Sequence, residues 1–379
     1  MSSPVELSYK IGMLAPSRVG KTTLVASMLT EGQRLLAGTS VAMRAADNDT
    51  ANKIAVSEGV IRGALRARVF EPQRVPSTND PFQFTLRLEP SRGDVPIQFE
   101  ILDYPGAWLE QSGGEWNQTA WNECRGFLTD STVLLIPLDS VLLMEAGTDH
   151  ARALPAQLAV HQLEQLVRDW AKARRYKQYD EPALTVFCPL KCESYTADNG
   201  GLRDEAALLR RRTMQEYEGV IRAIREEASH AVLRYLPIDT FGCVELASAR
   251  WEPDPHAIGG AKCLPRFLVR PPGRLSRTGL EDLIMLLCRQ LVDTARLNTQ
   301  RAADYERVVA EGAKSYAEQR EGFFRDLWLS VSGQREQRRR VATLRGEIYG
   351  QKLGQTATLA DVLTSFSERP EGPRLGYVS

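Results

Sequence analysis

The chain has 379 residues, of which 43% are hydrophobic and 25% charged, and its 48 basic side chains balance 48 acidic ones. This composition is typical of a globular protein and excludes a disordered chain, a collagen-like repeat and a small disulfide-stapled domain. Because the formal net charge is zero, the whole chain offers no electrostatic attraction to nucleic acid or to an anionic membrane, and either kind of binding would need a local patch.

The start of the chain and its cysteines indicate the compartment. The first ten residues lack the basic and then apolar pattern of a signal peptide, and the sequence has no run of 18 apolar residues. The six cysteines are scattered, and Cys188 and Cys192 have no second pair at zinc spacing. We therefore expect reduced thiols, a cytoplasmic protein and no membrane partner.

The first elements in the chain are a predicted strand over residues 7–14 and, almost at once, a predicted helix over residues 21–36. Residues 37–80 are polar and irregular, and we expect a long loop there. Alternating apolar residues then predict an antiparallel hairpin, with strands over residues 82–88 and 97–103.

Short apolar runs and amphipathic segments alternate through the middle of the chain. Runs at residues 132–138 and 184–189 are typical of strands buried on both faces, and residues 233–238 predict another strand. Apolar stripes predict helices over residues 156–174 and 204–229. Strands separated by helices predict a mostly parallel sheet in an α/β fold.

The last third of the chain carries a weaker signal. Residues 242–278 are rich in Gly and Pro and lack clear periodicity. Helices are predicted over residues 280–292 and about 297–328, and the tail beyond residue 350 is expected to be loosely ordered.

The most specific motif follows the first strand. Residues 15–22, Ala-Pro-Ser-Arg-Val-Gly-Lys-Thr, fit the phosphate-binding pattern G-x-x-x-x-G-K-[ST] with alanine in the first position, between a strand and a helix as the pattern requires. Backbone N–H groups of such a loop point at phosphates, Lys21 supplies a positive charge, and the Thr22 hydroxyl binds Mg²⁺. Gly20 lets the backbone approach closely. The nucleotide-binding residues expected here are Ala15, Pro16, Ser17, Arg18, Val19, Gly20, Lys21, Thr22 and Thr23.

A second motif ends the second hairpin strand. Residues 103–106, Asp-Tyr-Pro-Gly, fit the pattern D-x-x-G about 80 residues after the phosphate loop. Asp103 is expected to hold Mg²⁺ directly or through water, and the backbone N–H of Gly106 is expected to sense the γ-phosphate.

A third motif points to the base of a nucleotide. Lys191 and Glu193 follow a predicted strand where guanine-specific proteins carry [NT]-K-x-D, although Leu190 cannot replace the Asn or Thr. Lys191 could cover the base, and Glu193 could accept the guanine N1–H and N2–H₂. Ser248 and Ala249 resemble the S-A-x loop whose backbone contacts the base. Because the motif is degenerate, ATP stays open as the alternative to GTP.

The order of these elements resembles that of Ras-like G domains. That resemblance implies a switch threonine before the first hairpin strand, for which Thr78 is the candidate and Ser77 and Thr50 are alternatives. The stretch D-Y-P-G-A-W-L at residues 103–109, with the S-R-x-G-K-T form of the phosphate loop, also resembles the bacterial YcjX-like proteins and related TRAFAC-class GTPases. In those families a Glu stands where this chain has Ala107.

The resemblance covers residues 9–30 and 97–110 well, residues 184–195 loosely and residues 196–379 hardly at all. It implies an α/β P-loop NTPase with a Ras-like, mostly parallel sheet, one antiparallel hairpin strand, GTP or GDP as ligand and Mg²⁺ as cofactor. The expected GTPase-like domain is 1–295, with helical insertions at about 142–180 and 195–230, followed by a helical extension at 296–379 with a loosely ordered tail. A protein partner is expected at the C-terminal helices, and nucleic acid is not.

Catalysis would be hydrolysis of the γ-phosphate by water, with loop rearrangement acting as a switch. Small GTPases orient the water with a Gln after the D-x-x-G glycine, but Ala107 has no polar atom. Arg18 is the candidate for an arginine finger in cis, because guanylate-binding proteins carry an Arg at the same place in their loop. Lys21 would stabilise charge, and Glu110 is the remaining catalytic candidate. The alternatives are an ATPase and a nucleotide-gated scaffold with negligible turnover.

Overall fold

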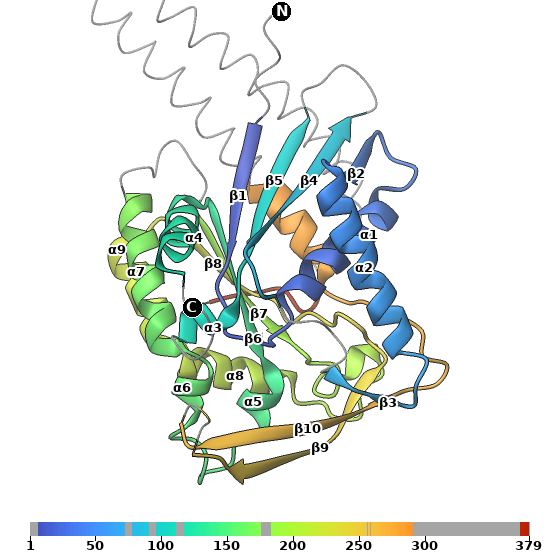
Figure 1. Cartoon of the computed structure of the whole chain (residues 1–379), viewed down its shortest axis with the longest axis vertical. Helices are drawn as coiled ribbons and strands as arrows, with labels where there is room; N and C mark the ends of the chain where they lie inside the picture. Colours follow the sequence, from blue (N-terminus) through green and yellow to red (C-terminus); the bar gives the residue numbers. More distant parts are fainter. Residues whose placement is uncertain are drawn as a thin grey trace, which may run out of the picture.

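The computed structural model describes residues 7–72, 78–90, 96–110, 117–175, 183–255, 257, 259–290 and 372–378. Its largest element is an eight-stranded sheet with helices on both faces (Figure 1). The strand order is β11-β8-β7-β6-β1-β5-β4-β2. The strands are β1 (Leu7–Met13), β2 (Val41–Ala45), β4 (Phe82–Pro90), β5 (Ile97–Asp103), β6 (Val133–Asp139), β7 (Leu184–Leu190), β8 (Val232–Tyr235) and β11 (Gly376–Tyr377).

The centre of the sheet is parallel and its two margins are antiparallel. Strands β5, β1, β6, β7 and β8 pair in parallel, whereas β2 pairs with β4, β4 with β5, and β11 with β8 in antiparallel register. In a parallel sheet the loops that follow the strands gather at one edge, where ligands bind in open α/β folds. The phosphate loop, the D-x-x-G turn and the segment of Lys191 and Glu193 follow β1, β5 and β7, so the topology brings these three loops to that edge.

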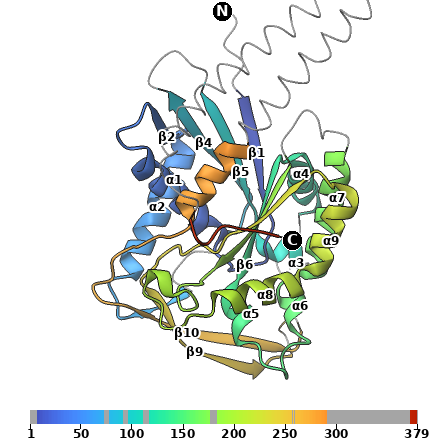
Figure 2. The same cartoon turned by 180° about the vertical axis from the view of Figure 1, so that it is seen from behind.

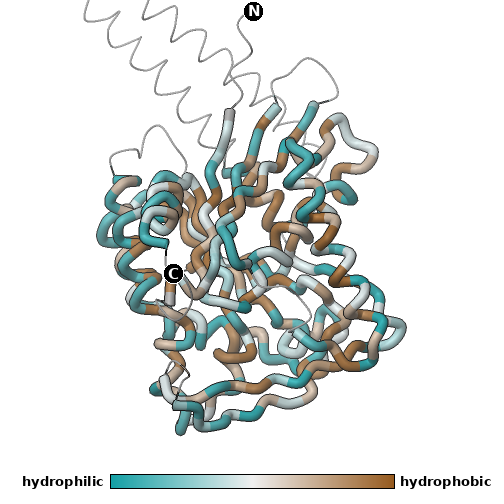
Figure 3. The backbone as a smooth tube through the Cα atoms, viewed as in Figure 1, coloured by the Kyte–Doolittle hydropathy of each residue, from teal (hydrophilic) through white to brown (hydrophobic). Residues whose placement is uncertain are grey.

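Two apolar layers hold the helices against the sheet, because neighbouring residues of a central strand point to opposite faces. In β6, Leu134 and Ile136 belong to one buried cluster, and Val133 and Leu135 belong to the other. In Figure 3 brown, hydrophobic segments gather in the middle of the fold, and teal, hydrophilic segments are more frequent at its outside. The predicted fold class, an α/β protein with a mostly parallel sheet and an antiparallel hairpin, is therefore confirmed.

Helices cover the sheet on each side (Figures 1 and 2). On one face lie α1 (Lys21–Leu36) and the helix that begins at Leu280, whose described part ends at residue 290. On the other lie α4 (Gln118–Asp130), α7 (Val160–Arg175) and α9 (Glu218–Glu227). The described residues also form the helices α2 (Asn48–Ala64), α3 (Gly106–Glu110), α5 (Ser140–Glu145), α6 (Leu154–Gln157), α8 (Ala206–Glu216) and the 3-10 helix η2 (Ala197–Asn199).

Residues 37–80 do not form the expected long loop, and that prediction is wrong. This stretch contains β2, α2 and the short strand β3 (Val69–Phe70). Asp47 caps α2, because its side chain accepts a hydrogen bond from the backbone N–H of Thr50 at 2.7 Å. The single helix predicted over residues 204–229 is divided at Tyr217 into α8 and α9.

A second sheet was not predicted from the sequence. Strands β9 (Val244–Pro253) and β10 (Ala261–Val269) form an antiparallel hairpin, and β3 pairs with β10 to give the order β3-β10-β9. The hairpin lies below the main sheet in Figure 1. Leu246 of β9 donates its backbone N–H to Ser194 Oγ at 2.7 Å, which ties the hairpin to the loop after β7.

The described end of the chain departs from the expected loose tail. Gly376 and Tyr377 form β11 and pair with Tyr235 and Arg234 of β8, while Arg374 is buried. The rest of the predicted extension, from residue 296 to residue 371, lies outside the described residues, as does the helix predicted over 297–328. Within the described part of the chain, no helix is both long and apolar enough to cross a membrane.

Candidate functional site

The loop between β1 and α1 wraps around the ammonium group of Lys21. Lys21 Nζ donates hydrogen bonds to the carbonyl oxygens of Ala15 at 3.0 Å and Pro16 at 3.1 Å, and it lies 5.1 Å from the centre of the Tyr104 ring. The side chain is almost completely buried. Gly20, which precedes the helix, has a φ of 116°, a left-handed value that favours glycine.

Arg18 also has a left-handed backbone, with a φ of 61°, and the residue is exposed. Left-handed residues in a loop turn successive N–H groups toward one side, which is the backbone feature of anion-binding nests. Val19, between Arg18 and Gly20, is buried and anchors the loop in the apolar core. The loop therefore has the backbone turns that a phosphate site requires.

Three side-chain oxygens from distant parts of the chain meet beside this loop. Thr22 Oγ1 donates a hydrogen bond to Asp103 Oδ2 at 2.5 Å, and Thr78 Oγ1 donates to the same oxygen at 2.9 Å. The two threonine hydroxyl oxygens lie 3.0 Å apart. Asp103 is fully buried, and its other oxygen, Oδ1, has no hydrogen-bond partner within the part of the chain that the structure describes. The structure thus brings together all three residues predicted to hold Mg²⁺.

The turn that carries Gly106 packs directly on the phosphate loop. A Cβ at Gly106 would lie 2.2 Å from the backbone nitrogen of Ser17 and 2.4 Å from the carbonyl carbon of Pro16. Only glycine permits this approach. Helix α3 begins at Gly106, and Ala107 is half-buried. The side chain of Glu110 lies outside the described residues.

Lys191 lies at the same edge of the sheet, on the loop after β7. Its ammonium group forms an ion pair with Asp139, which ends β6. Asp139 Oδ1 also accepts hydrogen bonds from the backbone N–H groups of Val141 at 2.9 Å and Leu142 at 3.2 Å and so caps α5. Lys191 is therefore held next to β6 by a carboxylate that is itself fixed in place.

Glu193 is buried and binds the loop after β8. Its Oε1 accepts hydrogen bonds from the backbone N–H groups of Phe241 at 3.2 Å and Gly242 at 3.4 Å. Burial, and after it the nearby carboxylate of Asp239, raises the pKa of Glu193 to about 8. The carboxyl group that was predicted to read guanine thus joins the loops after β7 and β8.

The other predicted residues lie elsewhere. Ser248 and Ala249 are in β9, opposite Arg266 and Pro265 of β10, and among the described residues no hydrogen bond or ion pair joins them to Lys191 or Glu193.

Thr50, one of the two alternative switch residues, is also apart from the site. Thr50 Oγ1 donates a hydrogen bond to Asp47 Oδ2 at 3.0 Å and accepts one from the backbone N–H of Thr85. Thr50 therefore connects α2 to β4. Ser77 lies outside the described residues, and Thr23 is buried in α1.

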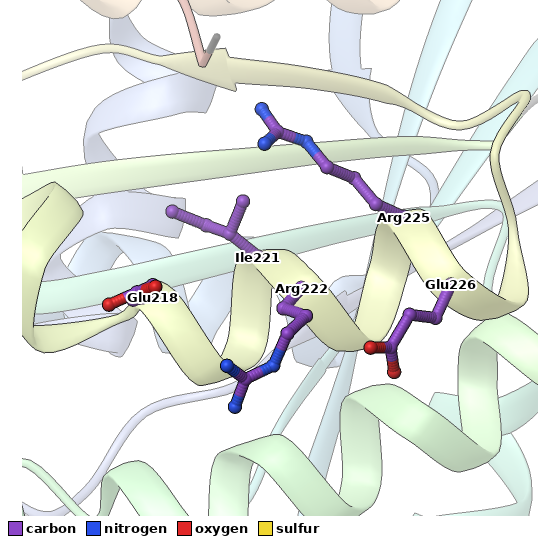
Figure 4. Close-up of a pocket in the computed structure, with 5 residues that line it drawn as sticks. All are labelled: Glu218, Ile221, Arg222, Arg225 and Glu226. Carbon is purple, nitrogen blue, oxygen red and sulfur yellow. The ribbon is translucent and has the colours of Figure 1, made fainter.

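Sequence reasoning missed Asp139 and the segment 239–242. Both directly follow predicted strands, at residues 132–138 and 233–238, and a search for polar residues after every predicted parallel strand would have found them. A shallow depression lined by Glu218, Ile221, Arg222, Arg225 and Glu226 lies on α9 (Figure 4), and no predicted site residue lines it.

Comparisons with known proteins give little beyond the fold. No protein-family model matches this sequence, and no curated protein matches it. The GTPase-like domain of S. cerevisiae Ski7, bound to GTP, is similar with 13% identity and a TM-score of 0.30 over 62% of this chain and 43% of that chain. Sup35 complexed with GDP is similar with 12% identity and a TM-score of 0.25, covering 62% and 38% of the two chains. This chain therefore spans less than half the length of either protein. A similarity this distant supports no argument about function.

Proposed function

We propose that this chain binds and hydrolyses a nucleoside triphosphate, preferably GTP, with Mg²⁺ as cofactor, and that it acts as a molecular switch. The observation that carries the proposal is the convergence of Thr22, Thr78 and Asp103 beside the phosphate loop. These residues lie on α1, on the segment before β4 and at the end of β5. A purely structural turn does not require two hydroxyl groups from such distant segments to meet at one buried carboxylate.

The three residues fit Mg²⁺, which prefers oxygen ligands from hydroxyl and carboxylate groups and from phosphates. A fully buried carboxylate whose Oδ1 has no protein partner among the described residues is costly unless a cation or another donor satisfies it. We propose that the hydroxyl oxygens of Thr22 and Thr78 and the carboxylate of Asp103 hold the ion. When bound, Mg²⁺ supplies positive charge to the β- and γ-phosphate oxygens.

The chain's own residues would do the rest. The loop N–H groups bind the phosphates, and Lys21 Nζ exchanges the carbonyl oxygens of Ala15 and Pro16 for phosphate oxygens. Water attacks the γ-phosphorus, the bond to the bridging oxygen breaks, and the leaving diphosphate keeps the electron pair. Arg18 lies on the exposed side of the loop, where a guanidinium can reach charge that develops on those oxygens.

The base and the switch complete the proposal. Lys191 and Glu193 would receive guanine, with ATP as the alternative ligand. Thr78 and Gly106 would move with the γ-phosphate, because one belongs to the oxygen cluster and the other lies on the phosphate loop. We also propose that residues 1–295 form the GTPase-like domain and that a protein partner binds the extension from residue 296.

A scaffold with negligible turnover is the second candidate, and Ala107 favours it, since this residue has no polar atom to orient water. One experiment separates the candidates. GTP, GDP, ATP and ADP are titrated with and without Mg²⁺, and phosphate release is followed at saturation. We expect Mg²⁺-dependent binding with a preference for guanine and measurable phosphate release. Binding without phosphate release would favour the scaffold, tighter binding of ATP than of GTP would favour the ATPase, and no binding of any nucleotide would refute the proposal.

A further inference from the structure

A buried charged network connects residues 372–378 to the loops at the carboxyl edge of the sheet. The Arg374 side chain is 5% exposed. Its Nη2 donates to Asp239 Oδ2 at 2.7 Å and to Thr196 Oγ1 at 2.9 Å, and its Nε donates to Asp198 Oδ2 at 2.6 Å. Such a fork of donors holds three acceptors in a fixed relation that a single ammonium group could not reproduce.

Asp239 is the centre of this network. It is fully buried, and besides Arg374 it accepts hydrogen bonds from Asn199 Nδ2 at 3.0 Å and from Cys192 Sγ at 3.1 Å. Cys192 lies between Lys191 and Glu193 on the loop after β7. Asp239 lies on the loop after β8, two residues before Phe241. The network therefore spans the two loops that Glu193 joins.

The positive charge of Arg374 affects Glu193 through Asp239, which lies between them in the network. Burial and the carboxylate of Asp239 both raise the pKa of Glu193, so an Asp239 without a countercharge would oppose ionisation of Glu193 further. The ion pairs that the described residues provide to Asp239 come from Arg374. Removing one partner of a buried ion pair leaves an uncompensated charge, which the surrounding loops must relieve by moving or by taking up a proton.

Arg374 is held in position independently of these loops. Its segment continues into β11, which pairs with β8, and Arg210 Nη2 donates to the carbonyl oxygen of Tyr377 at 2.6 Å. Arg225 Nη2 donates to the carbonyl oxygen of Val378 at 3.1 Å. On the other side, Gly372 donates its N–H to Asp282 Oδ1 at 3.0 Å. Both ends of the segment are thus fixed to the main fold.

We propose that Arg374 is a positioning residue for base recognition: by neutralising Asp239 it keeps the loops after β7 and β8 together, with Glu193 held between them to receive guanine. The inference rests on the proposed function, because it takes Lys191 and Glu193 as the base-reading residues. It adds the segment 372–378, which the sequence motifs do not include, to the nucleotide site.

The test uses the full chain and fluorescent analogues of GDP and ADP. The quantity compared is the ratio of guanine to adenine affinity, because a structural defect that lowers the folded fraction leaves this ratio unchanged. We expect Arg374→Gln to lower the ratio at least tenfold and Arg374→Lys, which keeps the charge, to lower it less. Arg225→Gln is the matched control, since it removes a bond to the same segment without touching Asp239, and its ratio should equal that of the parent.

If the single variant Arg374→Gln does not fold, the same affinity ratio is measured with Arg374→Gln added to the variant Asp239→Asn. In Asp239→Asn there is no carboxylate to neutralise, so adding Arg374→Gln should change the ratio by less than about threefold. A tenfold loss in that background, or an unchanged ratio in the single variant Arg374→Gln, would overturn the inference while leaving the proposed function intact. A parent protein with no guanine preference would overturn both the inference and the assignment of Glu193.

Discussion

Replacing Gly106 with alanine tests how the phosphate loop and the D-x-x-G turn fit together. The added Cβ would lie 2.2 Å from the Ser17 nitrogen and 2.4 Å from the Pro16 carbonyl carbon, both of them backbone atoms that cannot rotate away. Non-bonded heavy atoms rest at about 3.5 Å or more, so the two segments must separate by more than about 1 Å. Overpacking of this kind costs about 1–3 kcal/mol of unfolding free energy.

The same substitution should affect nucleotide choice. If the Gly106 N–H binds the γ-phosphate, displacing the turn removes a hydrogen bond to a charged group, worth about 1.5–3 kcal/mol. We therefore expect the preference for triphosphate over diphosphate to fall by about tenfold or more, since about 1.4 kcal/mol corresponds to a factor of ten. Denaturant unfolding measures the first effect, and paired titrations with GTP and GDP measure the second.

Replacing Gly126 with alanine is a matched control, for which we expect the opposite effect on the stability of the fold. It lies inside α4, and nothing lies within 4 Å of the position where its Cβ would be. Gly126→Ala should stabilise the fold by about 0.5–1 kcal/mol, because alanine is the better helix former. A Gly106→Ala protein as stable as its parent and with unchanged discrimination between GTP and GDP would refute the reasoning.

Three further predictions concern single side chains. Lys21→Ala should weaken triphosphate binding strongly while sparing the fold, and unchanged affinity in an equilibrium titration would contradict the phosphate-loop assignment. Arg18→Ala should keep GTP affinity within a few-fold and lose at least about tenfold in kcat, about 1.4 kcal/mol of barrier, and single-turnover phosphate release tests this. Glu193 has a raised pKa, so the native state holds a proton that the unfolded state releases between about pH 4.5 and 8, and this contribution to stability falls as pH rises through that window. In Glu193→Gln this dependence should disappear from denaturant unfolding at pH 6 and pH 8.5, and an unchanged dependence would show that another group titrates.

The parts predicted from the sequence are those with strong local signals. The helix predicted over residues 21–36 coincides with α1, because Gly20 precedes it and a continuous apolar face runs along it. The strand predicted over residues 132–138 corresponds to β6, Val133–Asp139, which is buried along its whole length, as expected for a central parallel strand. Thr22 and Asp103 followed from motifs with fixed spacing, and Thr78 followed from the element order of the resembling families.

The parts that were missed have weak local signals. Helix α2 buries only Thr50, Ile54, Ile61 and Ala64, so its apolar stripe is thin and its sequence resembles that of a polar loop. Strand β9 is largely exposed and carries charged residues among its apolar ones, which hides the alternation. Neither segment shows from its own sequence which partner it will pack against.

Long-range contacts at the site depend on the fold itself. Glu193 contacts Phe241, 48 residues away, and Arg374 contacts Asp239, 135 residues away. These pairings arise because β7, β8 and β11 are neighbours in the sheet and place their connecting loops together. A motif search that looks only at local spacing has no means of finding them.

The central claim is that Asp103, with Thr22 and Thr78, holds Mg²⁺ next to the bound phosphates. The most direct measurement is the GTP affinity with and without Mg²⁺ for the parent, for Asp103→Asn and for Glu100→Gln, a control on the same strand whose side chain instead accepts a hydrogen bond from Ser8. We predict that Mg²⁺ tightens GTP binding at least tenfold in the parent and in Glu100→Gln, and that this gain is lost in Asp103→Asn while binding without Mg²⁺ stays within a few-fold. The same Mg²⁺-dependent gain in Asp103→Asn as in the parent would contradict the account.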